Sequence, residues 1–142
     1  MRDLIDKLGF AVALPAAVYS ADNTPATIDL LGFDSALIEL HVGAGGITFS
    51  GVNKIEFVLT HSTDDQTYIP VTDADLQGVS GTSGGIIKSL IAAHAAADIT
   101  KIGYVGNKRY VKLLADFSGT HGTGTPIAAS VVKGNAGSAP VA

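Results

Sequence analysis

Two aspartates in the middle of the chain have the spacing of calcium ligands. Asp73 and Asp75 copy the opening of an EF-hand calcium loop, but its last position, where a glutamate must bind the ion through both oxygens, is Gly84. The sequence therefore excludes an EF-hand. A looser calcium site that adds Asp64 and Asp65 stays open as a minor alternative to turn aspartates that face solvent.

The other residues able to do chemistry are scattered. The four histidines follow no metal-binding spacing, although strand pairing could bring His41 and His61 together. The glutamates, Glu39 and Glu56, both alternate with apolar residues, as charged side chains on the solvent face of a strand do. We therefore expect no bound metal.

The glycine-rich segment at residues 119–125 resembles a phosphate-binding loop only in its glycines. It has no lysine, and Pro126 and a strand-like segment follow it instead of a helix. No serine stands in a motif typical of acyl transfer. The sequence thus predicts a protein that binds and does not catalyse, and that uses no cofactor.

Composition sets the frame for these residues. The chain has 142 residues, 46% hydrophobic and 15% charged, which predicts a single folded domain over residues 1–142. Cysteine is absent, so no disulfide can form. The net charge is −4, divided as −8 over residues 1–100 and +4 over residues 101–142. We expect no direct binding of nucleic acid, because the late cations Lys108, Arg109 and Lys112 lie in one short segment.

The longest apolar run, residues 8–18, has 11 residues and is too short to cross a bilayer. The run also lacks the flanks of a secretory leader, because aspartates offset the preceding basic charge and Tyr19 stands where a small residue should. We therefore expect no membrane contact and no leader.

Strand-like segments recur between clusters of turn residues, and this rhythm predicts an all-β antiparallel sandwich. In residues 54–61, Ile55, Phe57 and Leu59 alternate with polar side chains, as they do on a strand with one buried face. Gly106 and Asn107 predict a tight hairpin between the strands that flank them. The composition of residues 92–98 favours one short helix. Nine strands are expected, at residues 10–19, 27–31, 35–42, 54–61, 67–71, 86–91, 99–105, 108–117 and 127–133.

The two ends of the chain predict contact segments. Leu4, Ile5 and Leu8 are spaced for a short helical turn within an arm at residues 1–9, and this turn must dock on its own sandwich or on a neighbouring subunit. Residues 134–142 are small or polar and predict a tail that is flexible or bound to a partner.

Four phrases of the sequence carry a resemblance to known proteins. They are GITFSGVNKIEF at residues 46–57, LTHS at 59–62, IGYVGNKRYV at 102–111 and DFSGTHGTGTP at 116–126. Together they resemble small proteins encoded in the head-gene region of tailed phages and prophages, over residues 15–142. The phrases contain no catalytic motif.

This resemblance implies a virion protein similar to capsid cement or decoration proteins, some of which have jelly-roll-like sandwiches. It implies assembly in the bacterial cytoplasm, a place on the capsid surface, the major capsid protein as partner, and a homo-oligomer, either dimer or trimer. The residues predicted to make these contacts are Leu4, Ile5, Leu8, Phe10, Lys108, Arg109 and Lys112.

Two alternatives stay open. A tail or head-completion protein of this length could have the same strand pattern. A carbohydrate-binding module would need exposed aromatic rings, and the chain has four tyrosines and no tryptophan.

Overall fold

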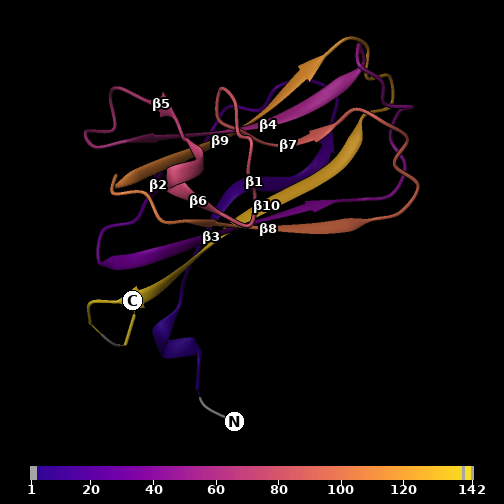
Figure 1. The fold of residues 1–142 in the computed structure, drawn as a ribbon. Coiled ribbons are helices and arrows are strands. Elements are labelled where there is room, and N and C mark those ends of the chain that lie inside the picture. Colours follow the sequence, from indigo (N-terminus) through magenta and orange to yellow (C-terminus); the bar gives the residue numbers. More distant parts are fainter. Residues whose placement is uncertain (1–2, 139, 142) are drawn as a thin grey trace.

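The structure is a computed structural model that describes residues 3–138 and 140–141. Strands dominate it, and they form two antiparallel sheets that face each other (Figure 1). Sheet A has the strand order β1-β10-β3-β8-β6; sheet B has the order β2-β9-β4-β5, with β7 also paired to β4. The elements are η1 (Ile5–Lys7), β1 (Gly9–Tyr19), β2 (Ile28–Asp29), β3 (Phe33–Val42), β4 (Lys54–Ser62), β5 (Ile69–Pro70), η2 (Asp73–Asp75), β6 (Leu76–Gln77), β7 (Ile86–Leu90), β8 (Asp98–Tyr104), β9 (Tyr110–Ser118) and β10 (Thr125–Ala136).

The core lies between the sheets, and the predicted alternation fills it. In β4, Ile55, Phe57 and Leu59 are buried between half-buried neighbours, because successive side chains of a strand point to opposite faces. Strand β3 buries Ile38 and Leu40 in the same way. The all-β sandwich and the short N-terminal turn, η1, are confirmed.

The predicted hairpin at Gly106 and Asn107 is wrong. Strand β8 pairs with β3 in sheet A, whereas β9 pairs with β4 in sheet B, so the connection crosses from one sheet to the other. Glycine is needed at position 106 for another reason: a Cβ there would lie 2.6 Å from the Tyr104 ring. The connection folds over that buried ring instead of reversing beside it.

The predicted helix at residues 92–98 is also wrong. Residues 91–97 form an irregular loop, and Asp98 already begins β8. Seven residues give too few hydrogen bonds to offset the cost of starting a helix. Pairing of Asp98 with Val42, and its ion pair with Lys88 at 2.6 Å, hold the end of this segment extended.

The first and last long strands lie side by side and set the position of both chain ends. β1 is an edge strand that pairs with β10, and β10 pairs with β3 on its other side. β10 continues to Ala136, so the first three residues of the predicted tail belong to the sheet. The arm and the C-terminal segment therefore leave the sandwich at the same end (Figure 1).

Candidate functional site

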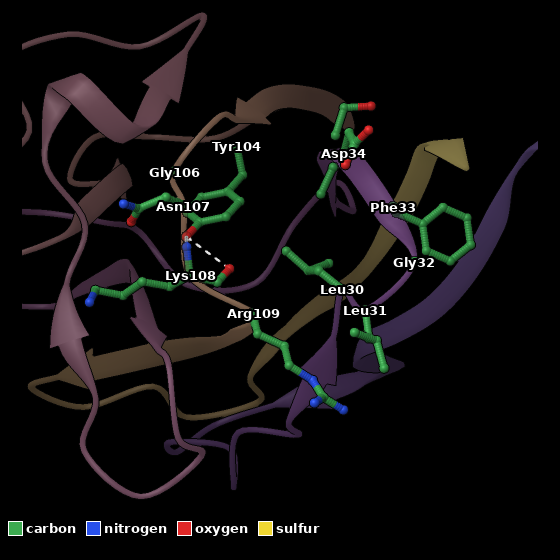
Figure 2. Close-up of a pocket in the computed structure, with 12 residues that line it drawn as sticks. Leu30, Leu31, Gly32, Phe33, Asp34, Tyr104, Gly106, Asn107, Lys108 and Arg109 are labelled. Atoms are coloured by element: carbon green, nitrogen blue, oxygen red, sulfur yellow. Dashed lines mark hydrogen bonds between the residues drawn. The ribbon is translucent and has the colours of Figure 1, made fainter. Parts of the chain in front are cut away.

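A pocket of about 330 Å³ opens at the end of the sandwich where the arm leaves (Figure 2). Two connections form it: residues 30–36 lead from β2 into β3, and residues 104–109 lead from β8 to β9. Leu30, Ala36 and Tyr104 contribute buried apolar surface, while Leu31 is exposed on the rim. The polar side chains of the lining are those of Asp34, Ser35, Asn107, Lys108 and Arg109.

The predicted arm residues lie at this same end. Gly9 pairs with Lys133 near the end of β10, and Phe33 begins β3 beside Ala136. The arm is held to the C-terminal segment by a hydrogen bond from the Val141 N–H to the Asp6 carbonyl, at 3.1 Å.

Most of the apolar side chains of the arm face solvent. Leu4, Ile5 and Phe10 are 62%, 81% and 66% exposed, and Leu8 is half-buried. Burial of one such side chain is favourable by about 1.5–3 kcal/mol. A partner that covers the arm would therefore gain binding free energy from these exposed side chains.

The three predicted cations all have polar or aromatic neighbours. Arg109 donates two hydrogen bonds to Asp29, at 2.8 and 2.7 Å, and this holds the pKa of the Asp29 carboxyl at about 2. The Lys112 Nζ atom lies 4.0 Å from the centre of the Tyr68 ring and 3.9 Å from Asp65.

Lys108 and Arg109 both line the pocket, and their side chains extend in different directions from the β8–β9 connection (Figure 2). Lys112 lies further along β9, outside the pocket lining. The structure therefore brings two of the three cations to the arm's end of the sandwich.

The pocket has a polar support that the sequence analysis missed. His61, buried in β4, shares a hydrogen bond of 2.9 Å between its Nδ1 atom and the Tyr104 hydroxyl, and the Lys108 N–H donates to that hydroxyl at 3.2 Å. Burial lowers the pKa of His61, against an opposing effect of Asp75, and burial raises the pKa of Tyr104. Both groups are thus neutral, and their bond ties sheet B to sheet A behind the pocket. His61 and Tyr104 stand in the phrases LTHS and IGYVGN, but no local pattern predicts that the two side chains meet.

The aspartates considered for calcium are occupied as turn residues. Asp64 accepts hydrogen bonds from the N–H groups of Gln66 and Thr67 and from the Ser62 hydroxyl, which lowers its pKa to about 2. Asp75 forms a capping box with Thr72 at η2.

Neither a metal-ligand cluster nor a membrane-spanning helix accompanies the pocket in the part of the chain that the structure describes. In residues 3–138 and 140–141, no three histidine or acidic side chains gather as metal ligands would. Nor does that part of the chain include a helix with the length and apolarity needed to span a bilayer.

Comparison with known proteins gives a likeness in fold. No protein-family model and no curated protein matches the chain. Among solved structures, the SPBc2 prophage-derived protein YomS is similar, with a TM-score of 0.51 over 89% of this chain and 91% of that one, at 9% sequence identity. At this identity the likeness concerns the fold, which the two proteins share over nearly their whole lengths.

Proposed function

We propose that the chain is a structural protein of a phage particle, and more specifically a capsid decoration protein that binds the shell and stabilises it. The observation that carries the proposal is the gathering of an exposed apolar arm and a cation-bearing pocket at one end of a closed sandwich. The fold likeness to a prophage-derived protein and the four phrases typical of phage head-region proteins support a place in the virion.

A surface of this kind suits binding to a repeating lattice. Each copy offers a few apolar side chains, Leu4, Ile5 and Phe10, whose burial is favourable, together with cations that can orient the contact. Many copies on a symmetric shell multiply a modest individual affinity. No deep polar cavity is required for such a role.

The buried polar side chains of the core support a structural role and give no support to a catalytic one. The buried polar pair, His61 and Tyr104, is neutral and hydrogen-bonded to itself and to the backbone of Lys108. A general base must reach a substrate proton, and His61 is 4% exposed. We assign the pair to holding the sheets together.

The test is to purify particles of the phage or prophage that encodes the chain, to identify their proteins by mass spectrometry and to reconstruct the head by cryo-electron microscopy. We expect density for this sandwich at regular positions on the outside of the shell. Its absence from the particles would overturn the virion role, and its presence only at the neck or tail would overturn capsid decoration in favour of the head-completion or tail alternative.

The contact surface is tested on the same particles. A chain that lacks residues 1–8 keeps β1 intact and should occupy the shell less than the full chain does. Val52→Asp changes an equally exposed apolar residue, 73% exposed, in the loop between β3 and β4 and should bind normally. Equal occupancy by all three proteins would remove the arm from the contact.

A further inference from the structure

We propose that two copies of this chain exchange arms, so that residues 3–8 of each fill the pocket of the other. The inference deepens the proposed function, because it names the first partner of the arm and makes a pair the unit that meets the shell.

The arm touches its own body at β10 and at Val141, but these contacts leave Leu4 and Ile5 exposed. None of the three residues of η1 is buried, and none of residues 3–9, the part of the arm that the structure describes, lines the pocket. A turn this short is unstable by itself, because few hydrogen bonds fix it. Leu4 and Ile5 therefore present two adjacent branched side chains to whatever covers them.

The pocket has the shape and surface that such side chains need. It is about 330 Å³ in volume and has a base of Leu30, Ala36 and Tyr104, which are 8%, 6% and 2% exposed. Leu31, 66% exposed, extends the apolar surface to the rim. Small apolar sites of this kind are completed by polar groups that fix orientation, here around the edge.

The charges of the arm and the rim are complementary. The arm has Asp3 and Asp6 on either side of its apolar pair, and the rim has Lys108 beside Arg109, whose guanidinium already pairs with Asp29. Within residues 3–8 the one cation is Lys7, and the lining of the pocket includes Asp34 as a possible partner of opposite charge. Complementary charges fix the register of a contact and speed its formation.

The positions of the arm and the pocket favour a closed dimer over an open-ended assembly of subunits. The arm and the pocket lie at the same end of the sandwich, so a two-fold axis beyond that end creates two identical contacts at once. Shallow apolar hollows also occur on the outer face of sheet A, near Val18 and Ile99. Among the described residues, no lysine or arginine lines these hollows, so they lack the charges that would match the arm's aspartates.

Disulfide trapping tests the exchange directly, because the natural chain has no cysteine. Chains with Ile5→Cys and chains with Leu31→Cys are mixed and oxidised under mild conditions. We expect covalent dimers that contain one chain of each kind, and few when Val52→Cys replaces Leu31→Cys. The double variant Ile5→Cys with Leu31→Cys should form dimers joined between chains.

Three results would overturn the exchange. They are a disulfide within one chain of the double variant, a yield no higher than that of the Val52→Cys control, and a higher yield between Ile5→Cys and Ile99→Cys. The last would place the arm in the hollow of sheet A.

Sedimentation of the unmodified chain gives a second readout. We expect a reversible dimer whose dissociation constant rises about tenfold or more with Ile5→Asp or Leu31→Asp and stays unchanged with Val52→Asp. Asp6→Lys and Lys108→Asp should each weaken the dimer, and their combination should restore part of the affinity. A chain that stays monomeric at every concentration would overturn the exchange, whereas the presence of the protein on shells, measured on particles, decides the proposed function separately.

Discussion

His61 and Tyr104 are two polar side chains in a core that is otherwise almost entirely apolar. Their hydrogen bond of 2.9 Å joins β4 of sheet B to β8 of sheet A, and their rings meet edge to face with centroids 5.8 Å apart. Leaving either group buried without a partner would cost about 1–3 kcal/mol, so each depends on the other. This pair is therefore a polar contact between the two sheets in which the neutral form of His61 is favoured.

We predict that the free energy of unfolding falls as the pH decreases below the ordinary histidine value of 6.5. Burial lowers the pKa of His61 in the folded protein, so the unfolded chain binds the proton more readily. The contribution of His61 to the free energy of unfolding is complete above pH 6.5 and is lost as the pH falls towards the pKa of His61 in the folded protein. Asp29 and Asp64, with pKa values of about 2, lose their contributions only below 3.8.

Urea unfolding of the wild type and of His61→Gln, measured from neutral pH down to about pH 5, checks this prediction. The variant should be less stable than the wild type at neutral pH and nearly independent of pH in this range. Identical slopes for the two proteins would show that another group controls the acid dependence.

At the scale of the element, β9 is completed by side chains as well as by strands. β2 pairs with β9 only through Ile28 and Asp29. Further along the same strand, Asn23 donates to the Leu113 carbonyl at 3.2 Å and accepts from the Ala115 N–H at 2.7 Å. The Phe117 N–H donates to Asp22 at 2.7 Å. These side chains stand in for a missing strand and cover groups that an exposed edge would offer to other chains.

We predict that Asn23→Ala lowers the free energy of unfolding by about 1–3 kcal/mol, because it removes both partners from half-buried backbone groups. Thr24→Ala, the change at the exposed neighbour, should stay within about 0.5 kcal/mol of the wild type. Equilibrium unfolding in urea measures both. A loss of the same size in the two variants would mean that the turn as a whole, and not the edge of β9, depends on this segment.

Sequence patterns predicted the strands better than their partners. The alternation in β4 is a local property, because a strand repeats every two residues, and it correctly identified Ile55 and Phe57 as core residues. Pairing is not local. Gly106 and Asn107 have the composition of a hairpin turn, yet the long ladder between β4 and β9 takes β9 into the other sheet.

The candidate site depends on the same long-range pairing. The arm and the cations at positions 108 and 109 are about a hundred residues apart in sequence and share one end of the sandwich because β10 lies between β1 and β3. The arm's apolar character could be predicted from Leu4 and Ile5, whereas the pocket could not, since its two walls come from different connections. The hydrogen bonds of Asp22 and Asn23 to β9 have no local signal either, because their partners lie more than 80 residues further along the chain.

For the molecule as a whole, the arm and the core have separate tasks. The core is closed by two sheets, and η1 adds no buried residue to it. The arm can therefore change its contacts with little effect on the stability of the body that carries it.

We predict that the chain without residues 1–8 and the full-length Ile5→Asp variant differ by no more than about 1 kcal/mol in their free energy of unfolding. Ile5→Asp is the reference because it too removes the proposed contact of the arm with a second copy. Leu14→Ala, at a site 1% exposed in β1, should instead cost about 2–5 kcal/mol. Thermal or urea unfolding gives both values. A collapse of stability in the shortened chain would mean that the arm supports the body, and a loss of shell binding would then need another explanation.

The place of β10 between β1 and β3 also governs how the protein is made. Sheet A cannot join β1 to β3 until residues 125–136, which form the strand between them, have left the ribosome. Until then, β1 has no strand partner and β3 can pair only with β8, so this half of the sheet stays incomplete on the nascent chain. Slow closure through distant contacts is the expected result, and a ribosome stalled before residue 125 should carry a chain that proteases readily cut.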